Sequence, residues 1–594
     1  MCGVAGLWSK QQVDLTSCLR PMLGALTARG PDGQGEWFDA DRGIALGHRR
    51  LKIMDQGRLG HQPALSGSGR YVLCYNGEIY NYRDLRGELA DRGYTFQGQG
   101  DTEVALACLD RWGVEESLQR WDGLFALAIW DRERGRLVLA RDRIGEKPLF
   151  YGHIGNQLVF ASELRALRRH PDFLLRLNSE ALALYLQHGW VPSPHCIQAG
   201  VFKLPPASLL SLENGEIRLS RYWSLVDALE PLEEQSPRVH CSEVHRLLRQ
   251  SVRARLDAQV PVGVVLSGGV DSTLVACVAR EFSPGGLDSF TLGFDEYDYD
   301  EAHYSRAIAH TLGLRHHEAR LSGAEAARRV LGLAEVYDEP FGDSCVLATR
   351  CLAELARGQV KVVLSGDGSD ELFFGYQRYM RIMAEWHGRP LNRAELRRRD
   401  RGPAGQPLLE DLHLKATALG FADPNSILQQ PQALSNLYGQ RPPGWPDQSK
   451  LLSFWDVKDY LSGDILTIVD RGTMSIGLES RAPFLSRPLV EYALSLPSQL
   501  GNRKLLLRRL LSHYLPTRLF ERPKQGFCVP IGAWLGGPLR PWASDLFSPQ
   551  FVRAQGLFQA EAVEQLWQDH QQTNRHGLKL WVLAIFQQWW AANA

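Results

Sequence analysis

An apolar segment that runs through a glycine turn into a helix is the feature that most constrains the fold. Residues 262–266 read Val-Gly-Val-Val-Leu, and Ser267-Gly268-Gly269-Val270-Asp271-Ser272 and a helical pattern follow. Two consecutive glycines let successive N–H groups point into the turn, and the helix N-terminus adds positive potential, so phosphate oxygens can bind there. The lysine and long glycine spacing of a Walker A loop are absent. A purely structural turn is the alternative.

Hydrophobic periodicity divides the chain into two parts with different patterns of apolar residues. Up to about residue 225, short alternating runs such as YVLCYNGEIY and RLVLARD predict a β-rich part whose sheets pack on one another or under helices. Further on, helical stretches alternate with apolar strands such as SFTLGF and VKVVLSGDG, which predicts a parallel sheet with helices on both faces. From about Met380 the pattern is mostly helical. Leu229 to Arg238, with two prolines and three glutamates, has the composition of a linker.

Composition favours a cytoplasmic enzyme that acts on small molecules. With 594 residues the chain is too long for one core. Lys+Arg and Asp+Glu both number 67, which gives no charge bias toward nucleic acid or a membrane. The ten cysteines lack Cys-x-x-Cys spacing, so reduced thiols are expected. No apolar run approaches the roughly 18–20 residues of a membrane span, and no apolar leader is expected before Cys2.

A second loop ends the strand VKVVL and carries Ser365, Gly366, Asp367, Asp370 and Glu371. Ligands of open α/β sheets bind at the carboxyl ends of strands, so this loop is expected beside the glycine turn. Mg²⁺ prefers one or two carboxylates plus phosphate oxygens, which makes Asp271 and Asp370 the candidate ligands. A solvated acidic turn is the alternative.

Cys2 follows the initiator methionine directly, so removal of Met1 would give an N-terminal cysteine. The α-amine has a reference pKa of about 7.7–8.0 and the thiol one of about 8.5, so the amine can accept the thiol proton directly or through a water. Cys2 is therefore a candidate nucleophile with its own base.

Together these features make the chain resemble the glutamine-hydrolysing asparagine synthetases of the bacterial B type. The N-terminal motifs are MCGVAG, ARGPDG, GHRRLKIMD, YNGEIYN, GDTEV and RDRIGEKPLFY. The resemblance implies a class II glutamine amidotransferase domain over residues 1–225, of the α+β N-terminal-nucleophile fold, an αββα sandwich. It also implies a linker at 226–238 and, over 239–594, an α/β domain of the ATP-pyrophosphatase type with a parallel sheet and a helical C-terminal part.

For the first domain the resemblance implies that Cys2 is the nucleophile and that Arg50 binds the glutamine α-carboxylate. Asn76 and the Gly77 N–H would form the oxyanion hole, and Glu78 and Asp101 would hold the glutamine amino group. Each has a plainer interpretation: a surface charge for Arg50, a hairpin turn for Asn76-Gly77, and a loop cap for Asp101.

For the second domain the resemblance implies ATP and Mg²⁺ as cofactors, and Lys504, in GNRKLLLRRLL, as the contact to the phosphates. A solvated helix lysine is the alternative for Lys504. The segments YDEPFGDS and ERPKQGFCVPIGAWL also match. The implied ATP contacts are Leu266, Ser267, Gly268, Gly269, Asp271, Ser272, Leu292, Ser365 and Gly366.

Three positions depart from the family pattern. Asp367 is the shorter variant of an acidic position, Phe374 replaces a glycine, and Ser486 replaces an aspartate near the expected acceptor pocket. Asp367 keeps a carboxylate with a shorter reach, and Phe374 puts a bulky side chain in the place of the glycine. Ser486 puts the acceptor in doubt.

The implied reaction is asparagine biosynthesis. Glutamine is hydrolysed at Cys2, ammonia crosses an internal tunnel lined by apolar and small residues, and ATP adenylates aspartate to give asparagine, AMP and pyrophosphate. One alternative is the same chemistry on another carboxylate, such as a sugar uronic acid or a secondary-metabolite precursor, and another is a catalytically retired scaffold. Expected partners are small molecules only, with no nucleic acid and no membrane, and a homodimer is left open.

Overall fold

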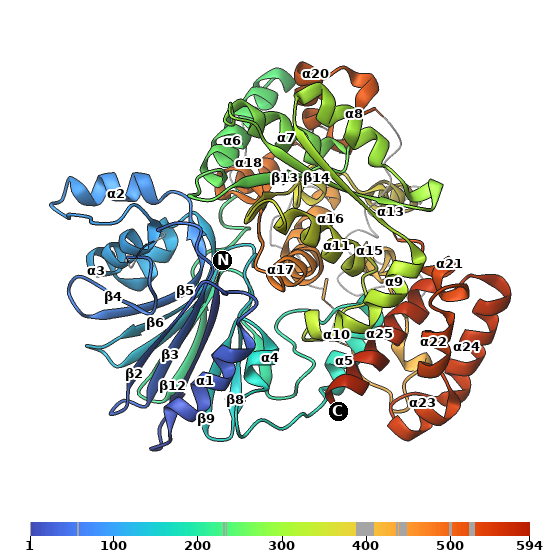
Figure 1. Cartoon of the computed structure of the whole chain (residues 1–594), viewed down its shortest axis with the longest axis horizontal. Helices are drawn as coiled ribbons and strands as arrows, with labels where there is room; N and C mark the ends of the chain where they lie inside the picture. Colours follow the sequence, from blue (N-terminus) through green and yellow to red (C-terminus); the bar gives the residue numbers. More distant parts are fainter. Residues whose placement is uncertain are drawn as a thin grey trace, which may run out of the picture.

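The computed structural model describes residues 2–55, 57, 59–229, 232, 235–387, 409–434, 437–438, 448–497, 500, 502–521 and 529–594. Two six-stranded antiparallel sheets form the N-terminal part (Figure 1). The first has the order β10 (Val201–Lys203), β8 (Phe150–Ile154), β9 (Gln157–Ala161), β1 (Gly3–Ser9), β3 (Ile44–Arg50) and β2 (Gly33–Asp39). The second has the order β12 (Glu216–Arg221), β11 (Ser208–Glu213), β7 (Arg136–Arg141), β6 (Gly123–Asp131), β5 (Tyr71–Ile79) and β4 (Ala64–Leu65).

Alternation along β5 explains how these sheets are layered. Val72 and Cys74 pack between the two sheets, whereas Leu73 and Tyr75 face α2 (Tyr82–Ala90) and α3 (Asp101–Arg120). On the first sheet α1 (Leu15–Ala25) and α4 (Leu164–Leu167) cover the outer face. Successive strand residues point to opposite faces, so each strand serves two cores. The predicted αββα sandwich is confirmed.

The second part is built on a parallel sheet with the order β15 (Arg315–Leu321), β14 (Asp288–Phe294), β13 (Val262–Val265), β16 (Val362–Leu364) and β17 (Glu479–Arg481). Val264 and Leu364 pack under helices on one face, and Phe290 and Val363 pack on the opposite face. The helices around the sheet are α6 (Pro237–Arg255), α7 (Val270–Glu281), α8 (Ala302–Leu312), α11 (Cys345–Arg357), α17 (Leu466–Met474), α18 (Arg487–Ser495) and α20 (Leu505–Tyr514). The predicted parallel sheet with two covered faces is confirmed.

Much of the remaining chain is helical, as expected. These helices are α5 (Ser179–His188), α9 (Gly323–Arg329), α10 (Leu333–Val336), α12 (Ser369–Leu372), α13 (Gln377–His387), α15 (Leu409–Thr417), α16 (Gln448–Trp455), the π-helix η4 (Asp456–Ile465), α21 (Ile531–Gly536), α22 (Arg540–Leu546), α23 (Pro549–Gln555), α24 (Ala560–Thr573) and α25 (Gly577–Asn593). None of the helices in the described ranges is long and apolar enough to cross a membrane.

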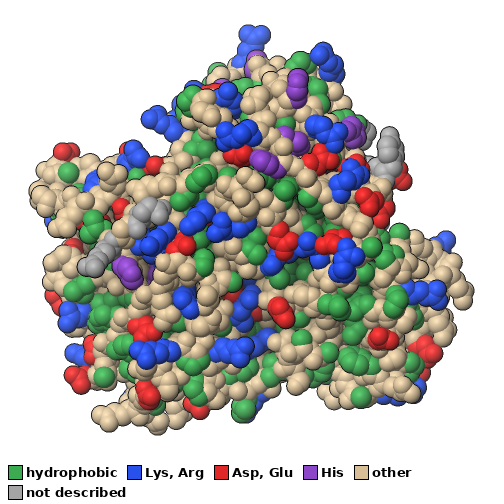
Figure 2. Space-filling view, viewed as in Figure 1, with side chains coloured by type: hydrophobic (Ala, Val, Ile, Leu, Met, Phe, Trp, Pro, Cys, Tyr) green, Lys and Arg blue, Asp and Glu red, His purple; other side chains and the backbone are tan. Residues whose placement is uncertain are grey.

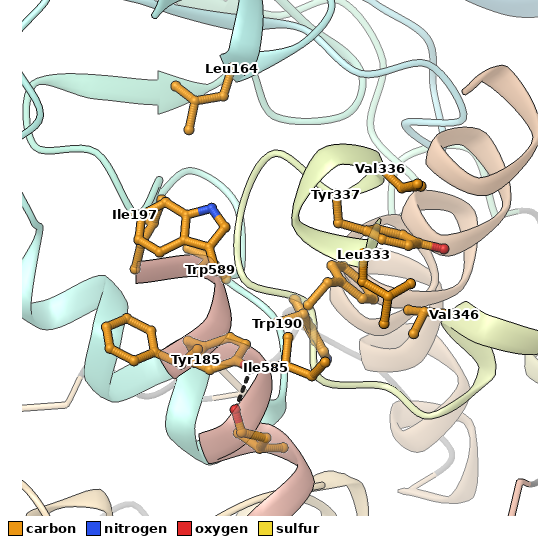
Figure 3. Packing of buried hydrophobic residues seen from close by; sticks show 14 of the residues in the cluster. Leu164, Tyr185, Trp190, Ile197, Leu333, Val336, Tyr337, Val346, Ile585 and Trp589 are labelled. Atoms are coloured by element: carbon orange, nitrogen blue, oxygen red, sulfur yellow. Dashed lines mark hydrogen bonds between the residues drawn. The ribbon is translucent and has the colours of Figure 1, made fainter. Parts of the chain in front are cut away.

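The two parts share one hydrophobic core. Tyr185 of α5 packs beside Ile585 and Trp589 of α25, and its hydroxyl donates to the Val582 carbonyl at 2.7 Å (Figure 3). The predicted linker lies partly outside the described residues, and α6 already begins at Pro237, inside the predicted linker. On the face shown in Figure 2, acidic and basic side chains both occur across the surface.

Candidate active sites

Cys2 and Asn76 are joined at the centre of the first candidate site. The Cys2 backbone N–H donates to Asn76 Oδ1 at 2.9 Å, with Asn76 fully buried on β5. Asn76 Nδ2 is also buried, and it has no hydrogen-bond partner in the part of the chain that the structure describes. Burial raises the pKa of the Cys2 thiol, and the nearby charge of Arg50 works in the opposite direction. A buried amide donor beside a thiol is the arrangement that an oxyanion hole requires.

Gly77 and Glu78 continue β5 next to this pair. A Cβ on Gly77 would lie 2.1 Å from the Leu124 carbonyl oxygen, so only glycine fits against β6. Burial, and then the negative charge of Asp101, raise the pKa of Glu78 well above its usual range. Asp101 begins α3, where its carboxylate accepts from the Ile79 N–H at 2.9 Å, and burial raises its pKa. The predicted amino-group ligands therefore lie close together.

Arg50 ends β3 and is buried, so the interpretation as a surface charge is wrong. Its guanidinium donates to the carbonyls of Gly57 at 2.9 Å and Met54 at 3.2 Å, and also to that of Asp55. Residues 56 and 58 of this loop lie outside the described residues. A glutamine carboxylate at Arg50 would share the guanidinium, which has five N–H donors, with these carbonyls.

The glycine turn after β13 has the form predicted for a phosphate loop. Gly268 has φ +72°, in the left-handed region, and Gly269 caps α7. The Ser267 and Ser272 hydroxyls lie 3.0 Å apart, and the Ser267 N–H donates to Ser272 Oγ at 3.1 Å. Leu266, directly after β13, and Leu292, within β14, are both buried. The serines thus hold the turn closed beneath its N–H groups.

The second loop packs directly against this turn, as predicted. β13 and β16 pair in parallel, and a Cβ on Gly366 would lie 2.9 Å from both Asp271 Cβ and the Ser272 nitrogen. Ser365 Oγ donates to Asp367 at 2.7 Å. Burial raises the pKa of Asp367, and the charges of Asp271 and Asp370 raise it further. The solvated-turn interpretation does not fit a carboxylate in these surroundings.

Lys504 joins the two loops. Its ammonium contacts Asp271 and lies 2.8 Å from Asp370 Oδ1, and its side chain is 5% exposed. The interpretation as a solvated helix lysine is therefore wrong. Asp271 Oδ1 is buried and has no hydrogen-bond partner among the described residues.

The donor set fits the predicted Mg²⁺ only in part. No three His, Cys, Asp or Glu side chains in the described ranges come together as a metal-binding group. Asp271 and Asp370 nevertheless supply two carboxylates beside the phosphate turn, one with a buried oxygen left over. That number suffices for Mg²⁺ when phosphate oxygens complete its coordination.

Arg481 of β17 connects the two candidate sites and has no local signal in the sequence. Its guanidinium lies 3.3 Å from Glu78 Oε1 and contacts Glu479 at 2.5 Å. Its carbonyl accepts from the Ser365 N–H at 3.0 Å. Burial opposes ionisation of Glu479, but neighbouring positive charge, Arg481 included, lowers its pKa to about 2. One strand end thus touches both sites.

Arg29, from the motif ARGPDG, is a second residue whose role the residue-by-residue predictions did not include. It is 1% exposed, and its Nε donates to the Cys2 carbonyl at 3.1 Å. Its guanidinium also pairs with Glu163 at 2.8 Å and with Asp470 of α17 at 2.7 Å. The backbone of Cys2 is therefore fixed to the second part of the chain.

The structure explains one of the family departures. Phe374 has φ +52°, a conformation that favours glycine, and its ring is buried against Tyr379. Gly375, which is kept, allows no Cβ, because that atom would lie 1.9 Å from Asp370 Oδ1. Ser486 is buried at the start of α18, where its side chain makes no capping hydrogen bond within the described residues.

Comparison with known proteins gives two family matches. Residues 243–591 match the asparagine synthase model, and residues 1–223 match a glutamine amidotransferase domain. "Asparagine synthetase [glutamine-hydrolyzing] 1" of Bacillus subtilis is 30% identical over all of this chain and 97% of its own. A "putative asparagine synthetase [glutamine-hydrolyzing]" of Mycobacterium tuberculosis is 32% identical over the same shares. "Amidase chry2" of Gibberella zeae is 27% identical over 92% of this chain and 90% of its own.

These matches span nearly the whole chain and agree with the sandwich and the parallel sheet that the structure contains. Both predicted groups of site residues are assembled in the structure, so nothing in it calls for the alternative of a scaffold that has lost its catalytic activity. The chain belongs to the asparagine synthase family, whose glutamine-hydrolysing members are ligases.

Proposed function

We propose that this enzyme is a glutamine-dependent asparagine synthetase. The observation that carries the proposal is the presence of two assembled sites on one chain. In one, Cys2 lies beside Asn76, whose Nδ2 has no hydrogen-bond partner among the described residues, and in the other Lys504 lies between the two strand-end loops. A division at residues 226–238 into an amidotransferase unit and a synthetase unit is part of the proposal. It is supported by the change from antiparallel to parallel sheets between β12 and β13.

Glutamine hydrolysis is assigned to the first site. The Cys2 thiol loses its proton to the α-amine freed by Met1 removal, and Asn76 Oδ1, which already accepts from this nitrogen, orients it. The thiolate attacks the side-chain amide carbon, and Asn76 Nδ2 and the Gly77 N–H donate to the oxyanion. The C–N bond breaks with proton transfer to nitrogen, ammonia leaves, and water hydrolyses the thioester to glutamate. Arg50, Glu78 and Asp101 hold the α-carboxylate and the α-amine.

Adenylation is assigned to the second site. The turn after β13 binds the ATP phosphates and Lys504 contacts them, with Leu266, Leu292, Ser365 and Gly366 completing the nucleotide contacts. Asp271 and Asp370 would hold Mg²⁺, which neutralises phosphate charge when bound. A carboxylate oxygen of the acceptor attacks the α-phosphorus and pyrophosphate leaves. Ammonia then attacks the acyl carbon, AMP leaves, and Asp367 takes up the proton that the new amide loses.

Aspartate is the proposed acceptor. Burial and Asp370 raise the pKa of Glu371, in the second loop, to about 7. Two more buried carboxyl groups form a group with it: the charges of Asp343 and Glu371 both act on Asp464, and burial raises the pKa values of Asp343 and Asp464. An acceptor with an ammonium group, such as aspartate, would compensate their ionised forms, whereas a uronic acid would not. The second candidate is another carboxylate, favoured by Phe374 and Ser486.

We infer that ammonia crosses between the halves past the cavity that separates them. This cavity has a volume of about 30 Å³ and is lined in part by Phe150, Tyr337 and Gly463. Asp338 and Arg471, 3.2 Å apart, also line it. The family resemblance implied a lining of apolar and small residues, whereas the lining of this cavity also includes charged residues.

Small-molecule substrates and a cytoplasmic location complete the proposal, with a homodimer left open. All nine described cysteines are free, which agrees with a reducing compartment.

Glutamate and pyrophosphate release, measured together against a panel of carboxylates, test the proposal. We expect aspartate to elicit pyrophosphate, AMP and asparagine, and a uronic acid to elicit none. Cys2→Ala should abolish glutamine-dependent synthesis and retain ammonia-dependent synthesis, with Cys18→Ala as the matched control. Pyrophosphate release with another panel member and not with aspartate would establish the second candidate.

A further inference from the structure

Lys504 occupies the position that two carboxylates would offer to a divalent cation. Its ammonium contacts Asp271 and lies 2.8 Å from Asp370, and these side chains are only 18% and 19% exposed. The two carboxylates belong to the two loops that flank the predicted phosphate site. Without a positive charge between them, two carboxylates this close would repel one another.

The backbone around Lys504 is shaped to hold it there. Arg503 and Lys504 have φ values of +50° and +59°, so two successive non-glycine residues lie in the left-handed region. The Lys504 N–H donates to the Phe373 carbonyl at 3.0 Å. On the facing side, a Cβ on Gly375 would lie 2.1 Å from Lys504 Cε. Strained backbone of this kind persists where the surroundings over-determine it, typically at ligand clamps and switches.

Where Lys504 contacts Asp271 and Asp370, its positive charge opposes the binding of a divalent cation between them. Asp271 and Asp370 each direct an oxygen at Lys504, and a dication placed between them would lie against a positive group that is nearly fully buried. The incoming triphosphate changes this balance, because its oxygens offer the ammonium a second anionic partner.

We propose that Lys504 is a stand-in cation that closes the metal site until nucleotide arrives. In the free enzyme it neutralises Asp271 and Asp370, and on nucleotide binding it moves onto phosphate oxygens and releases both carboxylates to the divalent cation. This inference rests on the proposed ATP site. It makes metal binding conditional on nucleotide, so free Mg²⁺ does not occupy the enzyme alone.

Mn²⁺ is the probe, followed by electron paramagnetic resonance on the full-length enzyme. Wild type and Lys504→Arg should bind Mn²⁺ only weakly without nucleotide. Lys504→Met and Lys504→Gln should each bind one Mn²⁺ without nucleotide, at least about tenfold more tightly than wild type, because one neighbouring like charge shifts ionic equilibria by about 1–3 pK units. Adding Asp370→Asn to Lys504→Met should abolish the new site. The matched control is Lys361→Met, which breaks the ion pair between Lys361 and Asp32. This variant should bind Mn²⁺ without nucleotide no more tightly than wild type does.

Each other outcome has a definite meaning. Nucleotide-free wild type that binds Mn²⁺ as tightly as Lys504→Met, or binding that survives Asp370→Asn, contradicts the stand-in role. The stand-in role is also contradicted if neither Lys504→Met nor Lys504→Gln binds Mn²⁺. It is contradicted as well if both variants fail to fold even with Mn²⁺ in the buffer, since a stand-in cation must be replaceable. A wild-type enzyme that binds no Mn²⁺ even with a non-hydrolysable ATP analogue instead contradicts the proposed ATP site.

Discussion

Arg481 of the synthetase half lies 3.3 Å from Glu78 of the amidotransferase half, and the same residue accepts a backbone hydrogen bond from Ser365 in the second loop. Glu78 is the carboxylate proposed to hold the glutamine amino group. Its charge therefore depends on a residue whose backbone is fixed to the nucleotide site, which gives the two reactions a direct physical connection.

Arg481→Gln should weaken glutamine binding without removing the nucleotide site. Burial and Asp101 raise the pKa of Glu78, and Arg481 opposes them, so loss of its charge raises that pKa further. Glutamine is bound by the ionised form, so the pH at which KM for glutamine falls should move upward. At neutral pH we expect KM to rise at least about tenfold, the effect of one lost neighbouring charge. Steady-state glutaminase kinetics from pH 6 to 9 measure this.

The matched control is Arg83→Gln, because Arg83 also pairs across the halves, with Asp257 at 2.8 Å, but is 70% exposed. Exposed pairs contribute only about 0–1 kcal/mol. Ammonia-dependent synthesis should persist in both variants. An unchanged pH profile in Arg481→Gln would mean that the 3.3 Å contact does not set the charge of Glu78.

Asn76→Asp separates the two functions of the Asn76 amide. The substitution keeps an oxygen to accept from the Cys2 nitrogen and removes the Nδ2 donor, which has no partner in the described part of the chain. Loss of one oxyanion donor should lower kcat for glutamine hydrolysis by about 10²–10³-fold, with a smaller change in KM. Asn81→Asp, in the same motif, is the control and should keep near-normal kcat. Equal losses in both variants would point to general damage to β5.

Arg29→Met should destabilise the enzyme, because it leaves Asp470 and Glu163 buried with less positive charge. Breaking a buried ion pair costs about 3–5 kcal/mol, whereas Arg20→Met, which removes a 64% exposed partner of Glu36, should cost about 0–1 kcal/mol. Thermal melts of both variants against wild type provide the comparison.

The pH dependence of this effect has a definite sign. Burial by itself would raise the pKa of Asp470, but the charges of Arg29 and then Lys147 lower it below its usual value. A carboxyl group of this kind stabilises the folded state above its unfolded pKa of about 3.9, and the stabilisation is lost as pH falls toward the folded pKa. The stability difference between wild type and Arg29→Met should therefore shrink below about pH 4. A difference that grows on acidification would contradict the assignment.

Local sequence patterns predicted the strands and turns, because these features depend on residues that are close together in the sequence. The alternating run that contains Val72 and Leu73 predicted a strand in packed sheets, and the apolar run before Ser267 predicted a turn at a sheet edge. These features follow from periodicity and from glycine conformations, which short segments carry by themselves.

Long-range pairs could not be predicted in this way. Arg29 and Asp470 are 441 positions apart, and Glu78 meets Arg481 only because β17 joins the edge of the parallel sheet. A single arginine in a motif carries no information about which distant carboxylate neutralises it. Family resemblance placed Lys504 near phosphates, but its ion pairs with Asp271 and Asp370 required the folded chain.

Asp367→Asn tests whether a carboxylate is needed at the adenylation centre. Asp367 follows Ser365-Gly366, accepts from Ser365 Oγ at 2.7 Å, and has its pKa raised by burial and by Asp271 and Asp370. Attack of ammonia on the acyl-adenylate creates a positively charged amine that must lose a proton, and a carboxylate with a raised pKa can accept it. Asparagine retains the shape and the Ser365 contact but cannot take the proton.

We expect AMP formation by Asp367→Asn to fall by at least about 10²-fold, the low end for a positioned acid–base group. Glutamate release at Cys2 should persist, because that chemistry belongs to the other half. Asp367→Glu restores the family's alternative residue and should be tolerated better than Asn if charge is what matters. AMP and glutamate release are measured side by side on both variants, with the folded fraction taken from thermal melts. Wild-type AMP release by Asp367→Asn would show that Asp367 only shapes the loop through Ser365.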